Sequence, residues 1–253
     1  MGLEVTGEVL ALLVLAAFCA GFVDSIAGGG GLITIPALLL AGVPPVTALA
    51  TNKLQGLFGA ASAAVHYARA GQVDLRAVAW PALGAFGAAA VGAVLAARLP
   101  VEVIGAVLPV VLIGIALYFG LRRGLSDADR AARIGPVALW AGVVPVVGFY
   151  DGLIGPGTGS FFMLALVARG GMGLLRATGQ TKVLNLASNL GGLAAFAVVA
   201  APWWATGLAM GAAQVAGAQI GARLAVRVGA RVIRPMLVVT STALALRLLW
   251  QGL

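Results

Sequence analysis

Two glycine-rich stretches decide the fold, Ile26-Ala27-Gly28-Gly29-Gly30-Gly31 and Ile154-Gly155-Pro156-Gly157-Thr158-Gly159. They interrupt the apolar runs 5–43 and 136–168, which are 39 and 33 residues long. As one helix the first run would reach about 58 Å, whereas a bilayer core is about 30 Å thick. Because glycine runs and an internal proline break helices, each run is predicted to form two helices joined at a non-helical tip, with new helices starting near Leu32 and Ser160.

The composition of the chain excludes a soluble protein. Of the 253 residues, 61% are hydrophobic and only 9% are charged, against roughly a quarter charged in soluble domains. Further apolar runs occupy 45–66, 77–97, 103–121, 177–200, 205–222 and 235–250. The net charge of +8 comes from arginines in the short gaps between runs, so it indicates membrane orientation and no nucleic acid partner. The chain is predicted to be one all-α integral membrane protein.

The breaks belong to an internal repeat. Residues 21–26 resemble 148–153 at an offset of 127, and residues 50–54 align with 179–183 at an offset of 129. The repeat is more than composition bias, because it matches aspartate and lysine, which are rare in this chain. It divides the chain into a first membrane repeat (1–121), a basic cytoplasmic linker (122–135) and a second membrane repeat (136–253).

Charge gives the orientation. If each broken run counts as two passes, each half has about five passes, and only Arg98 and Arg247 fall on the outer side, with Glu4, Glu8 and Glu102. The arginines on the inner side are Arg69, Arg76, Arg122, Arg123, Arg130, Arg133, Arg169, Arg176, Arg223, Arg227, Arg231 and Arg234. This is the positive-inside pattern. Because five is odd, the halves are predicted to be inverted repeats with both termini outside, as in secondary transporters.

Four charged residues lie inside the apolar runs and form two repeat-related pairs, Asp24 and Asp151 with Lys53 and Lys182. A charge near the bilayer centre costs roughly 2.5–3.5 kcal/mol on insertion scales, so it indicates function. In one interpretation the lysines neutralise an anion, while the aspartates take part in proton coupling or hold the tips through exposed amides. In the other, all four form buried ion pairs that only tie helices together.

The tips are the better candidate for substrate. A helix that starts after a glycine break exposes unpaired N–H groups, which bind anions. Polar side chains on the following helices add to the site, and the alternative for the glycines is close helix packing. The candidate binding residues are Gly28, Gly29, Gly30, Gly31, Asn52, Lys53, Gln55, Gly155, Gly157, Thr158, Gly159, Ser160, Thr181, Lys182 and Asn185. A stripe of Lys182, Asn185 and Asn189 shares one face, whereas Gln214 is interpreted as a packing contact.

These motifs resemble the TauE/SafE family of membrane permeases. The strings that carry the resemblance are residues 21–36 and 48–53 in the first half and residues 148–160 and 180–189 in the second. The resemblance extends over the whole chain in length, repeat and loop spacing. It implies a bacterial inner-membrane carrier for sulfur-containing anions such as sulfite, sulfoacetate or other sulfonates. Pro156 stands where the first half has Gly29, so the two tips are expected to differ.

The sequence therefore predicts a secondary transporter of small sulfur-containing anions that works by alternating access. An anion channel using the same helix N-termini is the alternative. With one His, one Cys and eight acidic residues, no nucleophile–base or metal constellation is visible, so neither an enzyme nor a cofactor or metal is expected. The expected partners are the small anion and the lipid bilayer. A coupling proton and a homodimer are left open.

Overall fold

The computed structural model describes residues 4–98, 126–239 and 242, and these residues are helical with short connections. The first broken run forms α1 (Gly7–Ala27) and α2 (Gly31–Leu40), followed by α3 (Pro45–Arg69) and α4 (Leu75–Ala96). The second forms η1 (Ala138–Val143), a π-helical stretch continued by α6 (Val144–Leu153), then α7 (Thr158–Ala168), α8 (Leu174–Val199) and α9 (Trp204–Val228). Residues 230–239 are also helical. Both runs break where the glycines predict.

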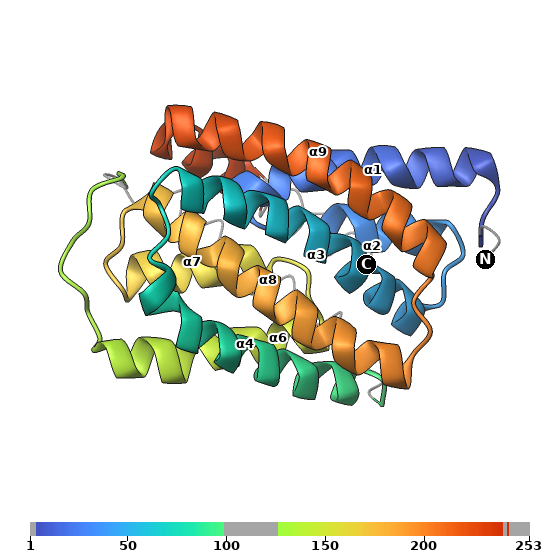
Figure 1. Cartoon of the computed structure of the whole chain (residues 1–253), viewed down its shortest axis with the longest axis horizontal. Coiled ribbons are helices and arrows are strands. Elements are labelled where there is room, and N and C mark those ends of the chain that lie inside the picture. Colours follow the sequence, from blue (N-terminus) through green and yellow to red (C-terminus); the bar gives the residue numbers. More distant parts are fainter. Residues whose placement is uncertain (1–3, 99–125, 240–241, 243–253) are drawn as a thin grey trace.

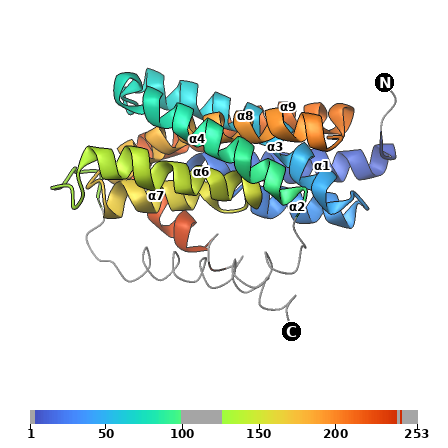
Figure 2. The ribbon, with the colours of Figure 1, turned by 90° about the horizontal axis from the view of Figure 1, so that it is seen from below.

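The helices form two layers (Figures 1 and 2). The long helices α9, α3, α8 and α4 lie side by side in that order in one layer. Behind them, α1 packs against α9, α2 against α3, α7 against α8, and α6 against α4. The contacts therefore come in matched pairs, because α1, α3 and α4 of the first half correspond to α6, α8 and α9 of the second.

Each broken run is a helical hairpin with a long and a short arm. Leu38 near the end of α2 packs with Leu13 in the first half of α1, and a Cβ on Gly170, just after α7, would lie 2.9 Å from Leu139 of η1. The short arms have 10 and 11 residues, about 15 Å each, so they cover only half of a bilayer core. The short arms are thus too short to cross a bilayer core, so the expectation of two full passes per broken run is wrong, while the side on which each terminus lies stays a prediction.

The two hairpins point toward each other. In Figure 1 the first enters from the end of the bundle where the N-terminus lies, and the second enters from the opposite end, so their tips meet in the middle. Glu4 accepts hydrogen bonds from the N–H groups of Ala205 and Thr206 at the start of α9. Asp127 at the opposite end accepts from Leu175 at the start of α8 and from Ala230.

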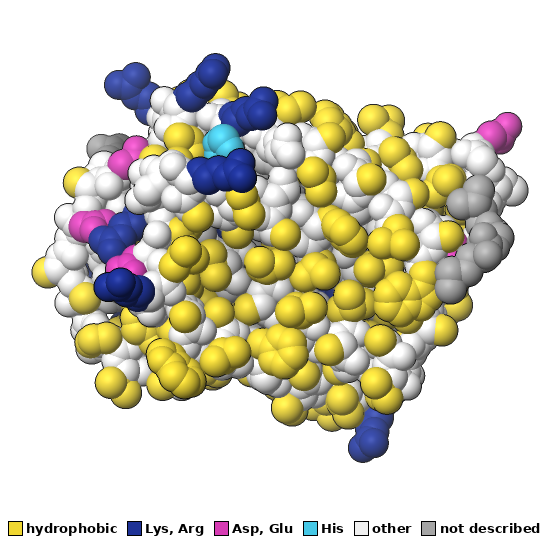
Figure 3. Space-filling view, in the orientation of Figure 1, with side chains coloured by type: hydrophobic (Ala, Val, Ile, Leu, Met, Phe, Trp, Pro, Cys, Tyr) yellow, Lys and Arg dark blue, Asp and Glu magenta, His cyan; other side chains and the backbone are white. Residues whose placement is uncertain are grey.

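The surface is that of a membrane protein. Among the described helices, α1, α4 and α8 are long and apolar enough to cross a bilayer. Large apolar side chains are fully exposed along these helices, such as Leu12 at 69%, Trp80 at 80% and Val198 at 86%. Figure 3 shows this apolar band across the middle of the face in view, with Lys and Arg side chains gathered at one end. Such exposure is stable only in lipid.

Candidate functional site

The two tips touch each other at the centre of the molecule. The Ser160 hydroxyl at the start of α7 donates a hydrogen bond to the carbonyl of Ala27 at 3.0 Å. Gly28 has a φ of 73°, and a Cβ on it would lie 2.5 Å from the backbone of Gly159. Only glycine allows both this conformation and this approach. The glycine runs therefore serve to bring two backbones into direct contact.

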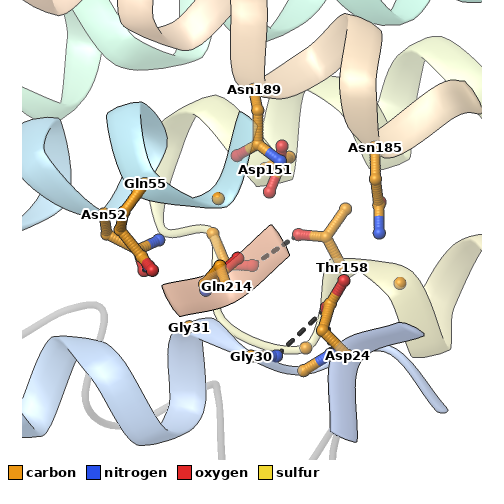
Figure 4. A pocket seen from close by; sticks show the side chains of 15 residues that line it. Asp24, Gly30, Gly31, Asn52, Gln55, Asp151, Thr158, Asn185, Asn189 and Gln214 are labelled. Carbon is orange, nitrogen blue, oxygen red and sulfur yellow. Dashed lines mark hydrogen bonds between the residues drawn. The ribbon is translucent and has the colours of Figure 1, made fainter. Parts of the chain in front are cut away.

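A small cavity lies beside this contact (Figure 4). Its volume is about 30 Å³, room for about two water-sized groups. Polar side chains from α1, α3, α6, α8 and α9 converge on it around the glycines of both tips. The lining residues are Asp24, Gly29, Gly30, Gly31, Asn52, Gln55, Gly56, Asp151, Gly155, Gly157, Thr158, Gly159, Asn185, Asn189 and Gln214.

Most of the residues singled out from the sequence meet at this cavity, including both aspartates. Five candidates do not line it, namely Gly28, Lys53, Ser160, Thr181 and Lys182. Gly28 and Ser160 form the contact between the tips, and Thr181 is buried on α8 with no partner for its hydroxyl among the described residues. The cavity also includes Gly56, Asn189 and Gln214, of which sequence reasoning gave Asn189 only a place in a polar stripe and Gln214 a packing role.

The lysines and aspartates form two ion pairs that cross between the halves. Lys53 Nζ of the first half lies 2.8 Å from Asp151 Oδ1, and Lys182 Nζ of the second half lies 3.2 Å from Asp24 Oδ2. Lys182 also donates to the backbone carbonyl of Asp24. The ion-pair interpretation of these residues is thus correct as geometry. Breaking such a buried pair on one side costs about 3–5 kcal/mol, so the pairs hold the two halves in register.

Asp24 also holds the first tip. Its Oδ1 accepts the N–H groups of Gly29 at 2.9 Å and Gly30 at 3.1 Å, as expected for an aspartate one turn before the break. In the second tip, two hydroxyl groups that donate to backbone carbonyls hold the tip instead. The Thr158 hydroxyl donates to the carbonyl of Gly155 at 2.6 Å, and the Tyr150 hydroxyl donates to that of Pro156 at 2.7 Å. The tips therefore differ, as Pro156 predicts.

Several polar groups around the cavity have unused hydrogen-bonding capacity. No hydrogen bond from the backbone N–H of Gly31, Gly157 or Gly159 is present among the described residues. Gln55 donates to Thr34 and Asn52, but its carbonyl oxygen has no donor, and neither has Oδ1 of Asn185. Buried polar groups normally find partners. Free amides at two helix N-termini facing one cavity are suited to an anion.

No constellation suited to metal binding accompanies these groups. Among residues 4–98 and 126–239, no three side chains of His, Cys, Asp or Glu come together as metal ligands would. The chemistry that the described cavity offers is hydrogen bonding and charge, from amides, carboxylates and one hydroxyl.

Among the described residues, an apolar helical bundle encloses a small polar cavity at its centre, an arrangement typical of multi-pass membrane proteins that handle small solutes. The family comparison gives the particular group. Residues 13–248 match the sequence profile of the family described as Sulfite exporter TauE/SafE, and the chain belongs to this family. It is a family of membrane transporters and not of enzymes.

Curated relatives agree over nearly the full length. The chain is 53% identical over 242 residues to a probable membrane transporter protein ORF9 of Sinorhizobium sp, covering 96% of this chain and 93% of the relative. It is 43% identical over 245 residues to the probable membrane transporter protein YfcA of Escherichia coli K12, covering 96% and 90%. A probable membrane transporter protein of Haemophilus influenzae is 39% identical, covering 96% and 95%. No solved structure matches.

Proposed function

We propose that the chain is a secondary transporter of small sulfur-containing anions, such as sulfite, sulfoacetate or other sulfonates, across the bacterial inner membrane. The anion binds in the cavity between the two tips and is held by the helix N-termini of α2 and α7. The observation that carries this proposal is the set of unpaired N–H groups of Gly31, Gly157 and Gly159 around one cavity. Such groups bind oxyanions without needing a cationic side chain in contact.

The size of the cavity and the residues around it favour an anion with a small head group. The cavity of about 30 Å³ admits only about two oxygens of a group such as a sulfonate, so binding of the whole solute would require the tips to separate. Asn52, Gln55 and Asn185 supply side-chain amides, which can donate to further oxygens of the anion. Lys53 and Lys182 lie behind the lining, where each is paired to an aspartate of the lining and so reduces the repulsion between that carboxylate and the anion.

We also propose that the halves are inverted repeats with both termini outside. The matched pairs of helix contacts and the entry of the two hairpins from opposite ends support this arrangement. In such a pair, rocking of one half against the other exposes a central site to either side in turn. The contact between the tips, where Ser160 donates to Ala27, is then the contact that must break and re-form.

Purified protein in vesicles tests the function. Vesicles loaded with unlabelled sulfite or sulfoacetate should accumulate the labelled anion in saturable counterflow, which a carrier shows. Flux without saturation or counterflow would instead identify the anion channel. A thermal-shift series with sulfite, sulfate, thiosulfate, sulfoacetate and taurine gives the substrate class, and failure of all five to stabilise the protein would contradict the site. A Gly157→Val variant should lose the stabilisation by its anion.

A further inference from the structure

The two repeat-related ion pairs are satisfied to different degrees. Both oxygens of Asp24 are used, Oδ1 by the amides of the first tip and Oδ2 by Lys182. Asp151 uses only Oδ1, at 2.8 Å from Lys53. Its Oδ2 is buried and has no donor within the described part of the chain. The Asp151 residue is 4% exposed and lines the cavity (Figure 4), so the free oxygen belongs to the substrate site.

Few charged groups face Asp151. From α3 comes Lys53, and across the cavity lies Asp24, whose charge is balanced by Lys182 of α8. Tyr150 on the same helix donates its hydroxyl to Pro156. Three further helical segments, α4, α7 and η1, pack against α6. Arg76 of α4 is the one titratable side chain within them. Arg76 lies in the first turn of α4, at the basic end, as Arg176 does on α8.

Lys53 is separated from the cavity by one glycine. A Cβ on Gly155 would lie 3.3 Å from Lys53 Nζ, so the absence of a side chain there lets the ammonium approach the second tip. While Asp151 is ionised, that ammonium is neutralised. Once Asp151 is protonated, the positive charge of Lys53 is available to an anion bound on the other side of Gly155.

We propose that Oδ2 of Asp151 binds a proton and that this proton travels with the anion. This proposal rests on the transport function proposed above. The proton comes from a hydronium ion that enters the cavity. One O–H bond of the hydronium breaks, which leaves water, and one O–H bond forms on Oδ2. The Lys53–Asp151 pair passes from neutral to a charge of +1, which compensates one negative charge of the substrate. Release of the anion on the other side restores the ionised pair and releases the proton.

The coupling between proton binding at Asp151 and anion binding has an expected magnitude. Because the coupling between two ligands is reciprocal, an anion beside Asp151 favours its protonation by the same factor by which the proton strengthens anion binding. Where Asp151 is ionised in the free protein and protonated in the complex, anion affinity should fall about tenfold for each unit of pH increase. Asp24 takes no part, because its carboxylate is fully used by the tip and by Lys182.

Infrared difference spectra between acidic and alkaline buffer, without any anion, test the proton site directly. The other carboxyls of the chain also protonate in acid, so the variants are compared with the wild type. A component of the protonated-carboxyl band that is present in the wild type and in Asp24→Asn, its repeat-related control, should be missing in Asp151→Asn. If the single Asp151 variant fails to fold because Lys53 is left unpaired, the double variant Lys53→Met, Asp151→Asn removes both charges. A protonated-carboxyl band that is identical with and without Asp151 overturns the proposal.

Sulfoacetate binding, measured by calorimetry in buffers of different ionisation heat, tests the coupling. Both acid groups of sulfoacetate are ionised at neutral pH, so any proton taken up goes to the protein. The wild type should take up about one proton per anion, and the Asp151 variants none. Binding without uptake overturns the coupling and leaves the transport function standing. If neither sulfoacetate nor sulfite binds, the transport proposal fails, while the infrared band still decides the proton site.

Discussion

Gly31 is the residue that best separates a binding role of the tips from a packing role. It is the first residue of α2 and has no positive φ, and a Cβ there would lie 3.2 Å from the Asn52 amide inside the cavity. Gly31→Ala is therefore compatible with the backbone but obstructs the anion. We expect sulfoacetate or sulfite affinity to fall by about tenfold or more, close to 1.4 kcal/mol, with little change in melting temperature.

Gly87→Ala on α4 is the matched control, because nothing lies within 4 Å of a Cβ at that position. Affinity for the anion should be unchanged in this variant. Titration calorimetry on the folded fraction of both proteins makes the comparison. Equal affinities for Gly31→Ala and the wild type would remove the first tip from the binding site.

Asp24 should behave as a structural residue. Asparagine at this position can still accept the N–H groups of Gly29 and Gly30, but it leaves the buried ammonium of Lys182 without its counter-charge. Asp24→Asn should therefore destabilise the fold by about 3 kcal/mol, measured by unfolding in detergent. The double variant Asp24→Asn, Lys182→Met should regain part of this loss. A single variant as stable as the wild type would show that the pair contributes nothing.

At the scale of residues, the sequence predicts which residues lie at the site better than it predicts which of them form ion pairs with each other. Rare charges within apolar runs indicate Asp24, Asp151, Lys53 and Lys182, because burial of a charge is costly. The exchange of partners between halves is a property of tertiary packing and leaves no local pattern. Gln214 reaches the cavity from α9, far along the chain from both tips, and a lone glutamine in a small-residue helix carries no signal of this.

Close packing of whole helices depends on other glycines. On α4, a Cβ at Gly92 would lie 2.2 Å from the Phe149 carbonyl and 2.8 Å from the Leu153 N of α6. Gly92→Ala must therefore push α4 and α6 apart, at a cost of about 1–3 kcal/mol. Gly87→Ala on the same helix should be neutral or stabilising, because alanine favours helix by about 1 kcal/mol. The melting temperature should thus fall in Gly92→Ala and stay unchanged or rise in Gly87→Ala, and equal shifts would contradict the packing role.

The described part of the linker, from residue 126 onward, holds the bundle together at one end. Asp129 accepts the N–H of Gly173 through Oδ1 and the guanidinium of Arg176 through Oδ2. These bonds hold the pKa of the Asp129 carboxyl below its usual range, the Gly173 N–H contributing most and Arg176 adding to it. A depressed pKa means that the stabilisation is complete above the unfolded pKa near 4 and is lost as the pH falls through the folded pKa.

Asp129→Asn should consequently lower stability at neutral pH, by at most about 1 kcal/mol because the ion pair with Arg176 is exposed. The difference from the wild type should shrink in acid, once Asp129 is protonated in both states. Melting temperatures measured from neutral pH down to about pH 3 check this, and a constant difference would show that the charge is irrelevant.

At the scale of elements, periodicity and length predict the broken runs because glycine and proline act locally on the backbone. The helices after the breaks begin at Gly31 and Thr158, one or two residues before the expected starts. The short arms could not be recognised as half-spans from apolar runs alone. Their length is fixed by where the chain turns back, near Gly42 and Gly170. Leu38 of α2 packs against α1, and the end of α7 at Gly170 packs against Leu139 of η1.

At the scale of the molecule, the fold places at one end of the bundle arginines that the charge pattern assigns to one side. Arg69 ends α3, Arg76 and Arg176 lie in the first turns of α4 and α8, and Arg227 is in the last turn of α9. These helix ends share one end of the bundle in Figure 1, the end at which Figure 3 shows the basic side chains gathered. By the positive-inside rule we expect this end to face the cytoplasm. Residues 2, 102, 122, 123, 247 and 252 lie outside the described residues, so their sides stay predictions.

Cysteine labelling in intact cells tests the orientation. Cys19 is exposed and is first replaced by serine. Ala201→Cys, exposed between α8 and α9, should react with an impermeant thiol reagent, whereas Ala128→Cys, exposed in the linker, should not. Cysteines at residues 2 and 252 should react like the one at 201, because two hairpins without net crossing leave both termini on that side. Labelling of 128 alone would reverse the protein in the membrane. Reaction at 252 but not at 2 would mean that the first broken run crosses the bilayer, and the inverted symmetry that places two tips at one cavity would be lost.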